Sequence, residues 1–227
     1  MRNIAKSLDS LKQKVVLAEQ RFGRQPGSVK VLAVSKTRSI QDIITAAGHG
    51  QRDFGENYAQ EAITKITSLT GHNLVWHFIG PVQSNKTQAI AAYFDWVHSA
   101  DRIKIIKRLN DARPDHLAPL NICIQINISK EPGKTGIRPD ELEQLLSECL
   151  NFPGVRIRGL MALPKPGNDF EQQRLQFREL KKLLEKINMN DGRYDTLSMG
   201  TSDDFEAAIA EGSTIIRTGT AIFGARS

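Results

Sequence analysis

The apolar positions of residues 1–22 recur at steps of three and four, beginning with Ile4, Leu8, Leu11 and Val15. This spacing is typical of an amphipathic helix. A stretch with two glycines and one proline follows and predicts the end of that helix. We therefore expect the chain to begin with a helix that packs one face against the rest of the protein.

After this helix, short β-branched runs alternate with helical patterns. The predicted strands are residues 29–35, 53–54, 74–79, 96–98, 120–128, 155–162, 196–199 and 214–217. The predicted helices are residues 40–47, 58–69, 85–94, 102–112, 140–150, 170–187 and 205–210, with a short last turn near 221–226. Strands that alternate with helices favour a parallel sheet, and eight of them favour closure into a barrel. We predict a single (β/α)8 TIM barrel over residues 1–227, with residues 1–24 as an extra N-terminal helix packed on it.

A doubly wound open sheet is the alternative, because strand number alone does not prove closure. Such sheets usually carry a glycine-rich fingerprint after the first strand. Here the first predicted strand runs into SKTRS, which has no GxGxxG pattern. The GKT at residues 133–135 lacks the earlier glycine of a P-loop, because Ile128 stands there. The barrel is the favoured prediction.

Length and composition fit an ordinary folded protein. The 227 residues are 40% hydrophobic and 25% charged, and a chain of this length needs no disulfide or metal to stabilise its core. Cys123 and Cys149 lie in predicted apolar segments without the spacing of a metal site, so we expect packing roles and a reducing compartment. We find neither an apolar run of about 18 residues nor a secretory leader. We expect a cytoplasmic protein that does not bind membranes.

The net charge of +6 indicates an anionic partner such as a phosphate, a nucleotide or RNA. The densest basic stretch, residues 102–113, alternates bases with isoleucine and leucine at helical spacing. That pattern is typical of a solvated helix face, so we do not expect nucleic acid as a partner.

Lys36 has an unusual position, directly after the first predicted strand. Strand alternation places it on the same side as Leu32 and Val34, so its amine points into the mouth if those residues fill the barrel. Burial would lower the pKa of that amine and favour a nucleophile able to form a Schiff base. The alternative is that Lys36 extends past the strand end to solvent. Three other lysines lie at the same predicted end, namely Lys86, Lys134 and Lys165.

The last two predicted strands are followed by small and hydroxyl residues that suit an anion. The loops after strands seven and eight are where barrels often bind phosphate. The predicted phosphate site comprises Ser198, Gly200, Thr201, Gly219 and Thr220. The alternative is that these residues only make turns.

Carboxylates and one cation stand beside this predicted phosphate site. Asp203 and Asp204 would repel a phosphate, so we expect them to cap the following helix with their side chains turned away. Arg217 ends the last predicted strand and is either a fixed cation facing the ligand or a salt-bridge partner of Asp203, Asp204 or Glu206. A Schiff-base lysine, a phosphate site and an arginine at one barrel mouth together describe a site for pyridoxal 5′-phosphate (PLP).

The same segments carry a resemblance to a known family. The segments are AVSKT at 33–37, FGENY at 54–58, WHFIGPVQSNK at 76–86, QINIS at 125–129, RGLMA at 158–162, SMGTSDD at 198–204 and RTGTAIFGAR at 217–226. In this order they resemble the pyridoxal phosphate homeostasis protein family, and above all its bacterial members. The similarity extends over nearly the whole chain from Val29 onward.

The resemblance implies a barrel like the N-terminal domain of alanine racemase, with PLP joined to Lys36 as a Schiff base. It places the phosphate on Ser198, Gly200, Thr201, Gly219 and Thr220. It also implies that Arg217 faces the pyridine nitrogen and that Asn57 borders the ring. The family often has Met where this chain has Thr201. Such proteins have no established reaction and are thought to buffer, carry or deliver PLP.

A PLP-dependent racemase is the alternative function. Racemases of this kind use a tyrosine from a further β domain as a second acid or base. This chain has Tyr58, Tyr93 and Tyr194, of which only Tyr58 is near a predicted strand end. An arginine at the pyridine nitrogen would keep that nitrogen unprotonated and weaken the ring as an electron sink. We therefore expect a PLP carrier rather than an enzyme.

Partners and metals complete the expectations. A barrel without an extra domain permits a monomer, with transient contact to apo PLP enzymes and Lys134 as a candidate second amine for the departing cofactor. His77 and His98 end neighbouring predicted strands, and Glu56 is a conceivable third metal ligand. We expect hydrogen-bonded core histidines rather than a metal site.

Overall fold

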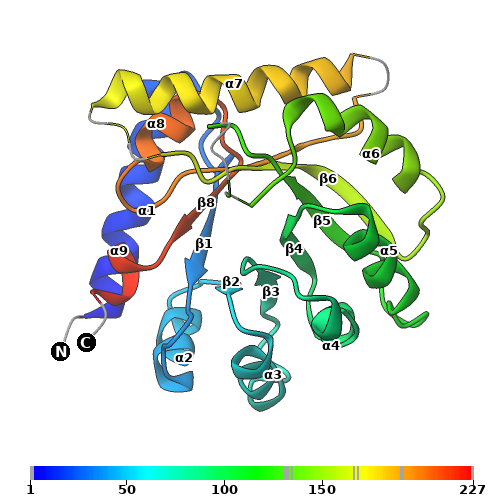
Figure 1. The fold of residues 1–227 in the computed structure, drawn as a ribbon. Coiled ribbons are helices and arrows are strands. Elements are labelled where there is room, and N and C mark those ends of the chain that lie inside the picture. The colour runs from blue at the N-terminus through cyan, green and yellow to red at the C-terminus, as the bar shows by residue number, and fades with distance from the viewer. Residues whose placement is uncertain are drawn as a thin grey trace.

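Eight parallel strands close into a barrel, because β1 pairs with β8 as well as with β2 (Figure 1). The computed structural model describes residues 3–129, 133, 135–165, 167, 169–189 and 192–225. The strands are β1 (Lys30–Val34), β2 (Asp53–Glu56), β3 (Val75–Phe78), β4 (Trp96–Ala100), β5 (Leu120–Gln125), β6 (Val155–Met161), β7 (Thr196–Ser198) and β8 (Ile215–Thr218). The predicted barrel is confirmed and the open sheet is excluded.

Helices surround the barrel on its outer side (Figure 1). They are α1 (Ile4–Arg21), α2 (Ile40–Gly48), α3 (Ala59–Ser68), α4 (Thr87–Tyr93), α5 (Ile103–Asp111), α6 (Leu142–Cys149), α7 (Phe170–Asn188), α8 (Phe205–Ala210) and α9 (Thr220–Phe223), with short 3-10 turns η1 (Ser84–Lys86) and η2 (Pro139–Glu141). The extra helix α1 contacts α2, α8 and α9, which belong to the layer of helices around the barrel. The extent of a single domain over residues 1–227 stays a prediction.

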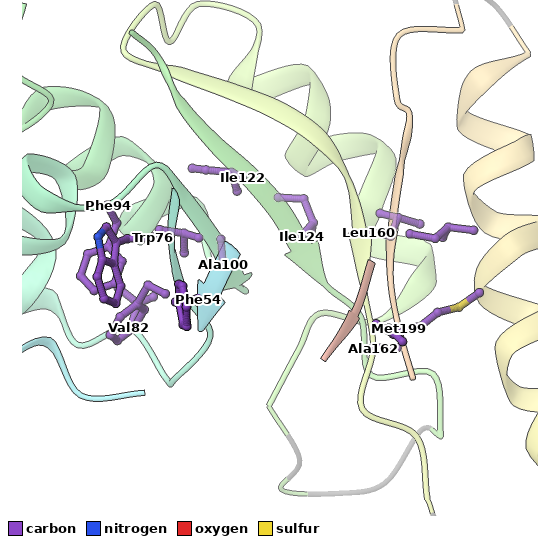
Figure 2. Close-up of a cluster of buried hydrophobic side chains, with 14 of the residues drawn as sticks. Phe54, Trp76, Val82, Phe94, Ala100, Ile122, Ile124, Leu160, Ala162 and Met199 are labelled. Atoms are coloured by element: carbon purple, nitrogen blue, oxygen red, sulfur yellow. The ribbon is translucent and has the colours of Figure 1, made fainter. Parts of the chain in front are cut away.

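Alternation along the strands separates two apolar regions. Side chains on the outer faces pack beneath the helices, and Figure 2 shows Phe54, Trp76 and Phe94 gathered on one side of this layer. A smaller cluster joins Trp96 to Cys123 and Met161. Both cysteines are buried and unpaired, which agrees with the expected packing roles.

The basic stretch after β4 is a solvated helix face, as expected. In α5 the buried positions are Ile105, Ile106 and Leu109, whereas Lys104 and Lys107 are exposed. Among the residues that the structure describes, no helix combines the length and the apolar character needed to cross a membrane.

Candidate functional site at the barrel mouth

A pocket of about 290 Å³ lies at the carboxyl ends of the strands. Carboxyl ends of barrel strands are where active and binding sites are usually found. Its lining comes from the first, second, third, sixth, seventh and eighth strands and the segments after them: Val34, Lys36, Arg38, Asn57, Ile79, Met161, Leu163, Thr201, Ser202, Asp203, Arg217, Gly219, Thr220 and Gly224. Six of the eight predicted site residues are therefore brought together.

Lys36 follows β1 and lines the pocket, as the strand alternation predicted. Its side chain is half-buried, and the next residue, Thr37, has a φ of 62°. Such a left-handed turn is uncommon for a residue with a branched side chain. Lys86 and Lys165 do not line this pocket, and Lys134 lies outside the described residues.

Arg217 lies at the floor of the pocket and is buried, with 6% of its surface exposed. One terminal nitrogen donates to the backbone oxygen of Ser198 at 2.5 Å and to its Oγ at 2.7 Å. The other donates to the backbone oxygen of Ala162 at 2.9 Å. Burial lowers the pKa of Arg217 to about 10, which leaves the group protonated at neutral pH.

No carboxylate of the described residues forms an ion pair with Arg217, so the salt bridges to Asp203, Asp204 or Glu206 that we considered are not found. A buried cation in this position attracts an electron-rich ligand group, because its charge is costly to leave uncompensated.

Asn57 follows β2 and lines the pocket with a hydrogen-bond acceptor. Its Oδ1 is buried and has no hydrogen-bond partner in the described part of the chain. The backbone of Asn57 packs directly against Gly80. A Cβ at position 80 would lie 2.1 Å from the backbone oxygen of Asn57, so there is no room for a side chain there. A buried acceptor without a donor costs free energy unless a ligand or water supplies the donor.

The loop after β7 is held in place by the side chain of Asp204. The Asp204 carboxylate accepts hydrogen bonds from the N–H and the hydroxyl of Thr201, at 2.6 and 2.8 Å. Asp204 therefore turns toward its own loop, whereas the exposed Asp203 reaches the pocket rim. The expected capping is not found: the Asp204 side chain turns to Thr201 and makes no hydrogen bond to the N-terminus of α8, and Asp203 lines the pocket.

Ser198 and Gly200 lie behind the pocket lining rather than in it. The hydroxyl of Ser198 is used by Arg217 and by Nδ1 of His98, at 2.7 Å from each. Gly200 has a φ of 97°, and a Cβ there would lie 2.7 Å from the Cβ of Ala208. These two residues support the loop and the arginine, so a direct phosphate contact from either stays a prediction that the pocket geometry does not favour.

The segment after β8 completes the lining of the pocket. Gly219 and Thr220 line the pocket at the start of α9, and Ser202 accepts a 3.3 Å hydrogen bond from the backbone N–H of Ala221. Ser202 thus joins the two loops of the predicted phosphate site. Ser202 was not among the residues predicted for the phosphate site, although its place directly after Thr201 was the available signal.

The two histidines form core hydrogen bonds, as expected. His77 Nδ1 lies 2.9 Å from His98 Nε2. Glu56 instead binds Ser35 and Lys65 on the outer side of β2. Within the described ranges there is no group of three metal-ligating side chains.

Comparison with known proteins places this chain in a family. Residues 7–227 match the family model described as the alanine racemase N-terminal domain. Pyridoxal phosphate homeostasis proteins of Pseudomonas aeruginosa and Escherichia coli K12 are each 48% identical to the chain, covering 100% of it and 97% and 98% of their own lengths. The chain belongs to the pyridoxal phosphate homeostasis protein family.

Solved structures agree with this membership. A structure of PipY from Synechococcus elongatus with PLP bound superimposes on 97% of the chain and 100% of PipY, with a TM-score of 0.84 and 34% identity. Alanine racemase from Corynebacterium glutamicum shares the fold at a TM-score of 0.66 and 18% identity, covering 96% of this chain and 62% of the racemase. The predicted family and its racemase-like barrel are confirmed.

Proposed function

We propose that this protein binds PLP in the mouth pocket and buffers, carries or delivers it in the cytoplasm without turning over amino acids. One observation carries the proposal. The pocket collects the amine of Lys36, the buried guanidinium of Arg217 and the Oδ1 of Asn57, which has no hydrogen-bond partner in the part of the chain that the structure describes. The names of the 48% identical relatives and the PLP bound by PipY support it.

These groups fit the chemistry of PLP. When bound, PLP supplies an aldehyde that reacts with amines and a ring that withdraws electrons. Lys36 is the residue that would hold the aldehyde covalently. Arg217 offers only donors, so it would meet the ring nitrogen through that atom's lone pair. Asn57 would border the ring and receive a hydrogen bond at Oδ1.

The phosphate would lie between the loops after β7 and β8. Ser202, Gly219 and Thr220 supply backbone and hydroxyl groups on that side of the pocket, whereas the N–H and the hydroxyl of Thr201 both donate to Asp204. Asp204 fixes the loop by binding Thr201, and the positive charge of Arg217 attracts the anion from beneath. Ser198 and Gly200 would act indirectly, by holding Arg217 and the loop.

The pocket is poorly equipped for racemisation, which is the second candidate. Moving a proton between the two faces of a substrate carbon needs an acid or base opposite the lysine. The described lining residues include no tyrosine, histidine or cysteine. Asp203 is the acidic lining residue and is exposed at the rim. The relationship to the racemase N-terminal domain favours this candidate only at the level of fold.

The proposal extends to the partners of the protein. One chain forms the whole described pocket, so a monomer would suffice, with transient contact to apo PLP enzymes during delivery. We expect neither nucleic acid nor membrane as a partner. Whether Lys134 accepts the departing cofactor stays a hypothesis.

Borohydride reduction of the PLP-loaded protein, followed by peptide mapping, tests the proposal. The pyridoxyl label should be found on Lys36, because this lysine lines the pocket. Lys36→Ala should lose the label, and Lys86→Ala is the matched control that should keep it. Label on Lys86, Lys134 or Lys165 in place of Lys36 would contradict the proposed site.

A further inference from the structure

A chain of polar side chains crosses the barrel interior from the pocket to the opposite end. TIM-barrel interiors are usually filled by branched apolar residues. Here Arg217 contacts Ser198 Oγ at 2.7 Å, and Ser198 Oγ lies 2.7 Å from His98 Nδ1. His98 Nε2 lies 2.9 Å from His77 Nδ1, and His77 Nε2 lies 3.0 Å from Asp53 Oδ1.

The far end of this chain is an ion pair. Lys30 Nζ lies 2.8 Å from the same Asp53 Oδ1, and these residues are the first of β1 and β2. The Lys30 side chain is 41% exposed, whereas both histidines are fully buried. This series of hydrogen-bonded side chains therefore extends from solvent beneath the barrel to the floor of the pocket.

The two end groups dictate where every proton in the chain lies. Arg217 can only donate and ionised Asp53 can only accept. Burial alone would raise the pKa of Asp53. Hydrogen bonds from His77 and Lys30 outweigh this effect and lower the pKa below its ordinary value, so Asp53 is ionised. Burial keeps the pKa of His77 below its ordinary value and that of His98 well below it, so both rings are neutral at pH 7.

Only one arrangement then satisfies each contact. His77 must carry its proton on Nε2 to donate to Asp53. His77 Nδ1 is then an acceptor, so His98 must carry its proton on Nε2. His98 Nδ1 is likewise an acceptor and takes the hydroxyl proton of Ser198. Ser198 Oγ is left with lone pairs, which it presents to Arg217.

We propose that Ser198, His98, His77 and Asp53 form a one-way hydrogen-bond chain that orients Arg217 as a donor and couples the pocket to the Lys30–Asp53 pair. All four are positioning residues, because they act on a ligand through Arg217. Three of the five N–H donors of Arg217 are used in bonds between described residues. The chain holds the guanidinium so that its other donors can meet a ligand. The ligand-dependent part of this inference rests on the proposed function.

The first test needs no ligand and no variant. Multiple-bond ¹H–¹⁵N NMR of the unloaded protein at pH 7 reports the tautomer of each histidine. We expect the proton on Nε2 in both His77 and His98. A proton on Nδ1 of either ring, or a doubly protonated ring, would overturn the one-way chain, whatever the outcome of the PLP-labelling experiment.

The second test changes the far end of the chain. Asp53→Asn removes the charge that enforces the direction, so His77 and His98 should lose their single tautomers. The affinity for PLP should weaken by about two- to tenfold, which is the range of one net hydrogen bond. The absorption maximum of the loaded protein should shift.

Asp195→Asn is the matched control. Asp195 precedes β7 at the same end of the barrel and binds Arg158, at 2.5 Å, rather than a histidine. Its replacement should leave the tautomers, the absorption maximum and the PLP affinity unchanged. Equal effects of the two substitutions would assign them to general electrostatics and overturn the coupling, as would wild-type tautomers and affinity in Asp53→Asn.

Discussion

The backbone N–H of Thr37 donates a 2.6 Å hydrogen bond to Oε1 of Glu61, which lies in α3. The same carboxylate oxygen accepts from Lys65 Nζ at 2.6 Å. Lys65 also donates to the backbone oxygen of Ser35 at 2.8 Å. Both neighbours of Lys36 are therefore held by one helix, which explains how the positive φ of Thr37 is maintained.

Replacing Lys65 should damage both stability and the site. Lys65 is 4% exposed and binds Glu56, whose other carboxylate oxygen is buried and has no hydrogen-bond partner among the described residues. Lys65→Met would leave a buried carboxylate uncompensated, which typically costs about 3–5 kcal/mol. We expect that loss in urea unfolding, together with slower covalent loading of PLP on Lys36.

Lys182→Met is the control for this substitution. Lys182 pairs with Glu179 at the surface, where both side chains are about 60% exposed, and such pairs contribute about 0–1 kcal/mol. Lys65→Arg should recover part of the loading rate by keeping a cation there. A Lys65→Met protein with unchanged stability would refute the role assigned to this buried cluster.

Two glycines that the sequence placed in one phosphate site should behave differently. Gly219 has an ordinary backbone conformation and lines the pocket, and a Cβ there would lie 3.3 Å from the Cβ of Val34. Gly219→Val should weaken PLP binding far more than binding of unphosphorylated pyridoxal, as titrations of both ligands would measure. Equal losses for the two ligands would place phosphate recognition elsewhere.

Gly200→Ala should instead destabilise the fold. The new Cβ would require a positive φ and would approach Ala208 within 2.7 Å, and overpacking alone costs about 1–3 kcal/mol. The free energy of unfolding should fall by that amount or more. Among molecules that remain folded, the preference for PLP over pyridoxal should be unchanged, so a selective loss of PLP binding would contradict this interpretation.

Lowering the pH should begin to destabilise the protein at a higher pH than the titration of ordinary carboxylates would cause. The buried His77 and His98 have lowered pKa values in the folded state, so below about pH 6.5 only the unfolded chain takes up their protons. Each histidine then lowers the free energy of unfolding by up to about 1.4 kcal/mol for each pH unit. Glu56 has a raised pKa and opposes this trend at lower pH.

Urea unfolding between pH 5.5 and 7.5 would measure this slope. His98→Gln should flatten it, whereas His72→Gln, at an exposed position, should not. A wild-type slope near zero would show that the two histidines are not buried as neutral rings.

The strands and helices of the barrel could be predicted from the sequence because local patterns of apolar residues indicate them. Apolar spacing and strand alternation predicted the elements and placed Lys36 and Arg217 at strand ends that face one mouth, whereas Asn57 was indicated by the family resemblance. The alternation could not say whether Ser198 turns toward the pocket or toward His98, a residue 100 positions away. That contact depends on closure of the barrel and on strand register, which no local pattern contains.

The carrier function predicts binding without turnover. The described pocket has the lysine needed to hold PLP but no second buried acid or base, so incubation of the loaded protein with L- or D-alanine should give no racemisation, decarboxylation or transamination. Mixing it with an apo PLP enzyme should restore that enzyme's activity. Lys36→Ala is the control, because without the covalent attachment it should carry less PLP through desalting and reactivate correspondingly less enzyme. Sustained turnover of either alanine that disappears in Lys36→Ala would instead establish the racemase-like alternative.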